Sequence, residues 1–171
     1  NNQNNYESKV VEKLKKNKFV VIKNFISNKE CKKIIEEIKN SIKNKKIKTW
    51  SDNFNSDNRI FGAEYISNQI NNFAKNKKIN NIGSLYIGQK LSTFMVMANQ
   101  VIFKKNNPGS GGGWHRDSFK RQFKAILYLN DVSLKNGPFE LIPNSSDLIF
   151  QYNTIFKFNR DLKNSRFSNS E

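Results

Sequence analysis

The chain has very few of the residues that build disulfides and metal clusters. Its 171 residues include one cysteine, Cys31, and one histidine, His115. A single cysteine excludes an internal disulfide and any zinc site made of several cysteines. Because Cys31 stands at helical spacing from Ile34 and Ile35, we interpret it as a half-buried, unreactive thiol.

Long hydrophobic runs are also missing from the sequence. No apolar run approaches the roughly 18 residues that a membrane span needs. The asparagine-rich start lacks the hydrophobic stretch of a signal peptide. These absences predict a soluble protein without a membrane partner, in a reducing and therefore cytoplasmic compartment.

Acidic residues are scarce beside basic ones, 14 against 30, which gives a formal net charge of +16. Such a charge suggests a nucleic-acid or anionic-membrane partner. However, lysine outnumbers arginine 25 to 5, and asparagine, lysine and isoleucine make up 71 of the 171 residues. Nucleic-acid binders more often cluster arginine with aromatic residues. We interpret the charge as a solvated, compositional feature and do not expect a nucleic-acid partner.

The length fits one domain, residues 1–171, with room for a hydrophobic core. Its first part predicts a helical layer over residues 6–90, preceded by a disordered start at residues 1–5. The clearest helix begins with a capping box, because Ser27 can bond the first free amides and Glu30 can bond back. The expected helices are 6–16, 28–44, 64–76 and 80–87, with a strand at 19–25 and a loop or short strand at 49–62.

After Leu91 the pattern changes to that of strands, which we expect to occupy residues 91–150. They are predicted at 94–103, 123–129 and 139–142, with turns at 106–109 and 136–138. A polar tail follows at residues 151–171. Helices first and antiparallel strands afterwards favour an α+β domain, in which a β-sandwich or barrel is backed by helices.

The stretch that carries chemistry is the glycine run followed by Trp114-His115-Arg116-Asp117. The glycines let the backbone bend sharply before His115. Side chains alternate along an extended segment, so His115 and Asp117 should share one face and Arg116 should point away. An imidazole and a carboxylate in adjacent positions suit the 2-His-1-carboxylate site of non-heme Fe(II) oxygenases. That site needs a second histidine, which this chain does not supply.

Further pieces follow this motif in a set order. After Trp114-His115-Arg116-Asp117 come the strand 123–129, Asn136-Gly137-Pro138, and the apolar strand that ends in Leu141-Ile142-Pro143-Asn144-Ser145-Ser146. In this order they resemble the phytanoyl-CoA dioxygenase family of Fe(II)/2-oxoglutarate oxygenases. The strand and capped helix at 19–31 also look like the family's opening. The resemblance covers about residues 15–150, and the ordered combination is far more specific than any single piece.

The resemblance implies a double-stranded β-helix (jelly-roll or cupin-like) fold flanked by the N-terminal helices. It implies that His115 and Asp117 are catalytic metal ligands and that Fe(II) and 2-oxoglutarate are the cofactors. The implied reaction is an O2-dependent hydroxylation of a small organic or acyl substrate, coupled to oxidative decarboxylation of 2-oxoglutarate to succinate.

Two further residues are candidates for cofactor binding. Asn99 stands where relatives carry a polar residue near 2-oxoglutarate, although it could equally bond to a neighbouring strand. Lys124 could meet a carboxylate of 2-oxoglutarate if it points inward. Its apolar neighbours Phe123 and Ala125 allow the alternative that Lys124 lies on the solvent face.

The chain departs from the family pattern at its C-terminal side. Ser146 stands in place of the motif's last histidine, which is not an iron ligand in the family. The family's distal histidine ligand and its 2-oxoglutarate-binding arginine lie well beyond the motif, and residues 147–171 contain no histidine. We therefore expect a C-terminally truncated fragment, inactive alone, whose reading frame continues past Glu171 with a histidine-bearing strand and then an arginine.

Two alternatives from other classes remain. One is a catalytically inactive jelly-roll binding protein that lacks the full iron triad, which the single histidine supports. The other is a basic nucleic-acid-binding module, which the net charge alone supports. Metal titration separates the first alternative from the oxygenase, and the salt dependence of nucleic-acid binding tests the second.

Overall fold

The computed structural model describes residues 2–44, 46–105, 113–118, 120–161 and 165–167. Its elements, in chain order, are α1 (Asn2–Asn17), α2 (Asn28–Lys43), β1 (Trp50–Ser51), β2 (Asp57–Phe61), a 3-10 turn η1 (Ala63–Tyr65), α3 (Asn68–Ala74), α4 (Lys77–Ile87), β3 (Met97–Val101), a second 3-10 turn η2 (Leu134–Asn136) and α5 (Leu148–Lys157). The mixture of helices with a small antiparallel sheet agrees with the predicted α+β class.

Helix α2 begins at the predicted capping box. The Ser27 hydroxyl accepts a bond from the Glu30 amide, and the Glu30 carboxylate accepts one from the Ser27 amide at 2.8 Å. Two amides without intrahelical partners are thereby satisfied. The apolar stripe of the helix turns inward and buries Ile34 and Ile38, so the prediction of a strong amphipathic helix is confirmed.

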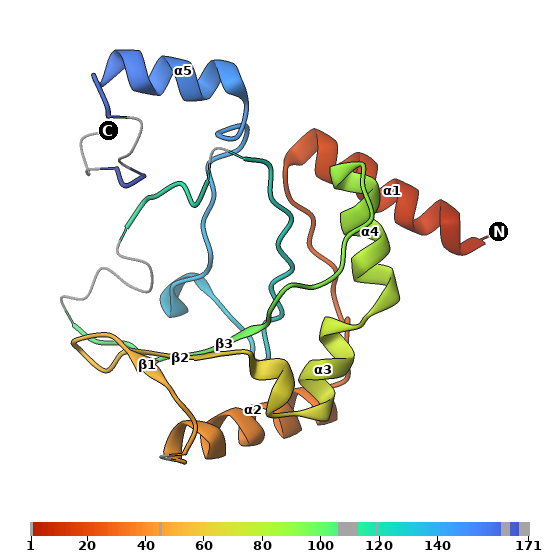
Figure 1. The fold of residues 1–171 in the computed structure, drawn as a ribbon, viewed down its shortest axis with the longest axis vertical. Coiled ribbons are helices and arrows are strands. Elements are labelled where there is room, and N and C mark those ends of the chain that lie inside the picture. The colour runs from red at the N-terminus through yellow and green to blue at the C-terminus, as the bar shows by residue number, and fades with distance from the viewer. Residues whose placement is uncertain (1, 45, 106–112, 119, 162–164, 168–171) are drawn as a thin grey trace.

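The sheet has the strand order β1-β2-β3, and both pairs are antiparallel. Helix α2 packs against β3 and against α3, below the sheet in Figure 1. The core between these elements consists of buried apolar residues from five segments, namely Ile34, Ile38, Ile60, Ala63, Ile70 and Ala98. The buried members of this core therefore all come from residues 28–101, and the partly buried Ile26 and Leu129 pack against it.

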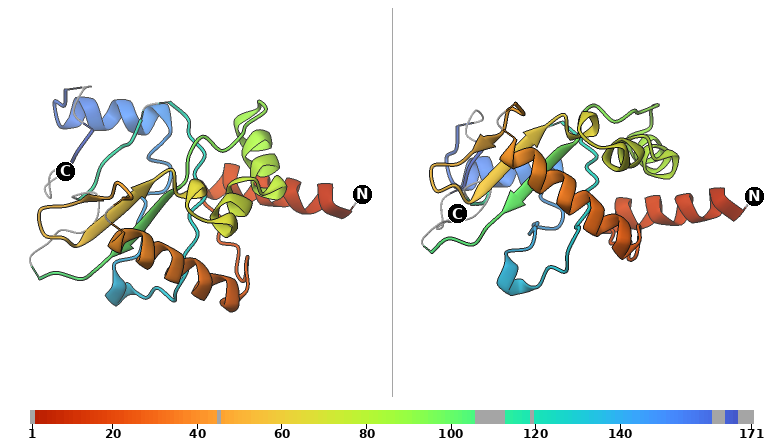
Figure 2. Two further views of the ribbon diagram at one scale, coloured as in Figure 1. Left: turned by 60° about the horizontal axis from the view of Figure 1, so that its bottom comes forward. Right: turned by 90° about the horizontal axis from the view of Figure 1, so that it is seen from below.

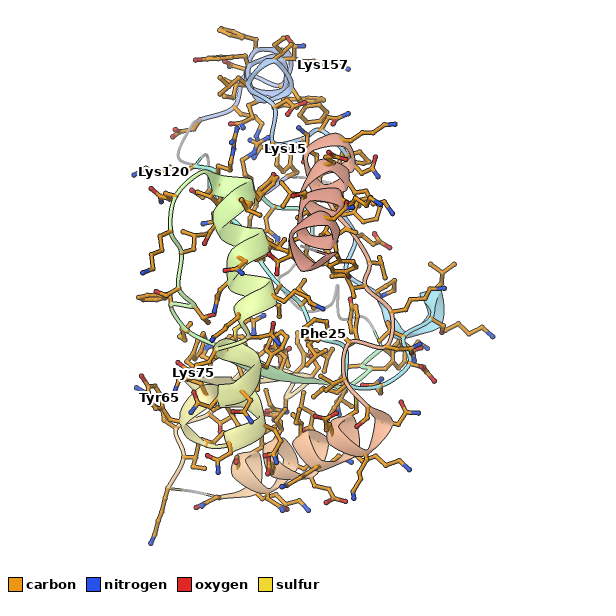
Figure 3. The ribbon with its side chains drawn as sticks, turned by 90° about the vertical axis from the view of Figure 1, so that its right-hand side faces the viewer. Lys15, Phe25, Tyr65, Lys75, Lys120 and Lys157 are labelled. Atoms are coloured by element: carbon orange, nitrogen blue, oxygen red, sulfur yellow. The ribbon has the colours of Figure 1, made fainter. Side chains whose placement is uncertain are left out.

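A second core joins α1 to α4, which lie side by side in Figures 1 and 3. Val10, Val11 and Leu14 of α1 pack with Ile82 of α4, and Phe123 joins them from the later part of the chain. Phe123 lies so close to Gly83 that a Cβ at that position would stand 2.7 Å from the Phe123 ring. Because Gly83 has no side chain, the segment that contains Phe123 can pack directly against α4 at this position.

Several boundaries in the helical layer differ from the prediction. Residues 2–5, expected to be disordered, extend α1, and Phe19–Ile22 form no strand. The predicted helix 64–76 is divided, because the Ser67 side chain caps the start of α3 by accepting the Ile70 amide. Helix α4 starts earlier than residue 80, at a cap supplied by Asn76, and ends at Gly88 as predicted.

The larger difference concerns residues 91–150, where the jelly roll was expected. Among the described residues only Met97–Val101 of this stretch lies in a strand, and segments 123–129 and 139–142 are extended without strand pairing. Strands need a partner to satisfy their amides. Without one, apolar side chains such as Ile126, Tyr128 and Phe139 stay about half exposed or more. The jelly-roll prediction is not confirmed.

The predicted polar tail contains a helix instead. Helix α5 begins at Leu148 and lies at the top of Figure 1 and at the upper left of the left-hand view of Figure 2, away from α2. Four of its apolar side chains, Leu148, Ile149, Tyr152 and Phe156, are largely exposed. None of the helices in the described part of the chain is both long and apolar enough to span a membrane.

Candidate functional site

The His115 segment is held in place by a short backbone pairing. His115 forms an isolated antiparallel bridge with Arg166. The Arg116 amide donates to the Ser165 carbonyl at 2.7 Å, and the Phe167 amide donates to the Trp114 carbonyl at 2.9 Å. The segment is therefore extended at His115, as side-chain alternation requires. The predicted turn at 106–109, with Gly111 and Gly112, lies outside the described residues.

The alternation has the predicted result. The Nε2 atom of His115 lies 3.2 Å from Oδ1 of Asp117. Arg116 points elsewhere: its guanidinium lies over the Phe167 ring at 5.5 Å and donates to the Ser145 carbonyl. Partial burial and nearby Arg160 lower the pKa of Arg116. The sequence thus predicted correctly that His115 and Asp117 meet on one side of the segment and that Arg116 turns away.

The imidazole ring of His115 is oriented by its other nitrogen. Nδ1 lies 2.9 Å from the Gly113 carbonyl oxygen. Nδ1–H can donate to this carbonyl in the neutral and in the protonated ring; only in the neutral ring does Nε2 keep a lone pair for a metal, whereas in the protonated ring it donates to Asp117. Gly113 has a φ of +87°, a conformation that favours glycine. The bend at Gly113 therefore aims the free nitrogen of His115 toward Asp117.

Asp117 is held from a second direction by Lys124. The Lys124 ammonium donates to Oδ2, the oxygen that does not face His115. This bond is the main reason that the pKa of Asp117 is lowered; partial burial opposes it, the charge of Lys124 adds to it, and so do the charge and hydrogen bond of His115 when its ring is protonated. A carboxyl with a lowered pKa is ionised at neutral pH. Asp117 is thus a carboxylate with one oxygen bound to Lys124 and the other near His115.

Asn99 lies in another part of the structure. It stands in β3 opposite Arg59 of β2 and donates to the buried Asp57 carboxylate at 3.4 Å. Asp57 also accepts from Nε of Arg59 at 2.8 Å. Asn99 thus has the strand-to-strand bond that was the alternative to cofactor binding. The structure brings His115, Asp117 and Lys124 together, but it does not bring Asn99 to them.

His115, Asp117 and Lys124 line a large open cavity. Its walls are mostly apolar and come from residues 19–26, 120–132 and 138–148, with Trp114 beside the His115–Asp117 pair. The cavity volume is about 2680 Å³, well above the roughly 300–1,000 Å³ of a fitted small-molecule site. The space is therefore a wide trough whose shape selects no particular substrate.

The pair has the geometry of two neighbouring metal ligands. An imidazole nitrogen and a carboxylate oxygen, each about 2.1 Å from one ion and at right angles, lie about 3 Å apart. The observed 3.2 Å agrees with that value. Within the described parts of the chain, no three His, Cys, Asp or Glu side chains gather in a group that could hold a metal. The donor set therefore fits two of the three protein ligands of an Fe(II) site.

The pairing of residues 114–116 with 165–167 was missed by sequence reasoning. Arg160 also lies over Phe167, at 3.9 Å, so one aromatic ring connects this region to the segment that carries His115. Residues 158–167 alternate too weakly between polar and apolar types to predict a strand. No local signal in this stretch indicates that it reaches the site.

Comparison with known proteins decides the family. The model of the phytanoyl-CoA dioxygenase (PhyH) family matches residues 14–157. The chain belongs to this family. Its members are oxygenases, so the coarse class of the protein is that of an oxygenase enzyme. No curated protein and no solved structure matches the chain.

Proposed function

We propose that this member of the phytanoyl-CoA dioxygenase family is an Fe(II)- and 2-oxoglutarate-dependent hydroxylase, with His115 and Asp117 as two of its metal ligands. The observation that carries the proposal is the 3.2 Å separation of His115 Nε2 and Asp117 Oδ1. This separation occurs in the motif that the sequence shares with the family and within the residues that the family model matches.

The roles of the residues follow from their contacts. His115 would supply a neutral nitrogen, because the Gly113 carbonyl holds the proton on Nδ1. Asp117 would supply a negatively charged oxygen, because Lys124 favours its ionised form. When bound, Fe(II) and 2-oxoglutarate would supply the chemistry by which O2 hydroxylates a C–H bond: one oxygen atom would enter the new hydroxyl group, and the other would enter the succinate formed from 2-oxoglutarate with release of carbon dioxide.

The substrate class is proposed from the cavity and the family together. Trp114 and the apolar stretches 123–129 and 138–142 line the trough beside the pair, which suits a small organic or acyl substrate. The family name refers to an acyl-CoA, and we extend to this chain only the coarser class. Contact of Asn99 with 2-oxoglutarate stays a prediction, as does cytoplasmic location.

The direct test is metal binding by matched variants of the intact protein. We expect Mn(II), as a redox-stable substitute for Fe(II), to bind to the wild type and far more weakly to Asp117→Ala. Asp147→Ala is the matched control, because Asp147 is equally exposed, lines the same cavity and also pairs with a lysine, Lys18 at 3.1 Å. Equal affinity in the wild type and Asp117→Ala would contradict the assignment.

Activity provides the second part of this test. The intact protein with Fe(II) should convert 2-oxoglutarate to succinate, and both His115→Ala and Asp117→Ala should abolish that conversion. A protein that binds neither metal nor 2-oxoglutarate would instead support the inactive binding protein. Nucleic-acid binding that survives about 0.2 M salt would support the basic module, since purely electrostatic binding is lost there.

A further inference from the structure

The Asp117 carboxylate is held from two sides by different residues. Oδ1 faces His115 Nε2 at 3.2 Å, whereas Oδ2 accepts from the Lys124 ammonium. The two carboxylate oxygens are therefore not equivalent. One faces the imidazole nitrogen that would bind a metal, and the other is already occupied by a protein donor.

The direction of Lys124 is set by its neighbour in the chain. Phe123 is half-buried against α1 and α4, where its ring lies 6.3 Å from that of Tyr86 and directly over Gly83. Side chains alternate along an extended segment, so anchoring Phe123 toward α4 turns Lys124 the other way. The contact with Asp117, seven residues earlier, thus depends on a core contact and not on a flexible lysine alone.

We propose that Lys124 is a positioning residue that holds Oδ2 of Asp117 and leaves Oδ1 alone to bind the metal beside His115. This inference rests on the proposed function. It gives Lys124 a different role from the sequence prediction, in which Lys124 bound 2-oxoglutarate itself. Ligating carboxylates are commonly held by a further hydrogen bond, and loss of such a partner weakens metal binding about 10–100-fold.

An opposing effect makes the test decisive. An ammonium group near a divalent cation repels it, so a lysine with no positioning role would weaken metal binding by its charge. Because the Lys124 and Asp117 side chains are 55% and 49% exposed, water and salt screen this repulsion strongly. Positioning and repulsion predict opposite signs for removal of Lys124, and positioning should dominate.

The experiment measures Mn(II) affinity, by electron paramagnetic resonance of free and bound ion, in the intact wild type and three variants. Lys124→Met, which removes both donor and charge, should lower the affinity about 10–100-fold and change the spectrum of the bound ion. Lys124→Arg, which keeps both, should restore most of the affinity and the spectrum. Lys120→Met, in the same segment and labelled in Figure 3, is the control for loss of a nearby charge and should change little.

The possible results separate the two proposals. Metal binding that depends on Asp117 but is unchanged or stronger in Lys124→Met would overturn the positioning role and leave the proposed function standing. Failure of the wild type to bind Mn(II) in an Asp117-dependent way would overturn both. Because the pair is half exposed, the Lys124 variants should keep the wild-type circular dichroism. An equal loss of affinity in Lys124→Arg and Lys124→Met, with unaltered folding, would also overturn the inference.

Discussion

Residues 28–101 contain a set of apolar side chains that are buried against one another, whereas no apolar side chain among residues 126–156 is fully buried. Ile34, Ile38 and Ile60 are at most 6% exposed, while Ile126 is 54% and Ile149 is 77% exposed. Isoleucine thus serves as a core residue in one region and stays exposed in the other, where Ile126 lines the open trough. The difference lies in the partners that each region finds and not in its composition.

The residues that stabilise the fold and the residues proposed to bind the metal also lie in different parts of the chain. The first region contains the capped helix α2, the sheet and a closed core. The residues proposed to act on the metal stand between the two regions, in a part of the chain that packs on the core of α1 and α4 through Phe123 and on the core of residues 28–101 through Leu129. A packed layer therefore positions a site whose apolar walls remain open. Substitutions in one region, each compared with a control substitution elsewhere, test this division.

The largest expected effect is on the core of the first region. Ile34→Ala removes a side chain that is 4% exposed in α2 and should lower the free energy of unfolding by about 2–5 kcal/mol. Ile149→Ala is the matched control, an isoleucine in α5 that is 77% exposed, and it should change stability by less than about 0.5 kcal/mol. Urea unfolding measures both. Equal losses would show that α5 is as well packed as α2.

A smaller effect should come from the contact between α4 and the segment that contains Phe123 and Lys124. Gly83→Ala places a Cβ 2.7 Å from the Phe123 ring, and such overpacking costs about 1–3 kcal/mol. The better helix propensity of alanine offsets this by about 1 kcal/mol. In a Phe123→Ala background the clash is absent, so Gly83→Ala should be neutral or stabilising there. A double-mutant cycle on unfolding free energies checks the coupling, and additive effects would contradict it.

The smallest effect concerns pH and the cap of α2. Hydrogen bonds from the Ser27 side chain and backbone lower the pKa of Glu30 below its usual 4.5. The folded state therefore favours ionised Glu30. Its contribution to stability is fully present above pH 4.5 and is lost as the pH falls through the lower folded value. The difference in Tm between wild type and Glu30→Gln should shrink in that acid range.

Glu36→Gln, an exposed position in the middle of the same helix, is the control for this pH profile, because it lies outside the cap. A wild-type advantage over Glu30→Gln that stays constant from neutral to acid pH would contradict the cap assignment.

Sequence reasoning succeeded where the signal was local. The Ser27–Glu30 box, the stripe of α2 and the alternation that brings His115 to Asp117 each depend on residues within a few positions of one another. It failed for segments 123–129 and 139–142, because an apolar run makes a strand only if a partner is present. The contact between Lys124 and Asp117 was also missed, since its direction depends on Phe123 packing against Gly83, a distant position in the chain.

The central claim is that His115 and Asp117 bind one metal ion, and the nitrogens of His115 allow a direct measurement. With histidine-selective ¹⁵N labelling of the intact protein, the signals of His115 are those that a His115→Ala variant lacks, so NMR can follow its two nitrogens during titration with Zn(II), a diamagnetic substitute for Fe(II). We predict that the Nε2 resonance shifts on binding while Nδ1 stays protonated against the Gly113 carbonyl, and that Asp117→Ala weakens the response. No change at Nε2 with saturating metal, or coordination through Nδ1, would contradict the account.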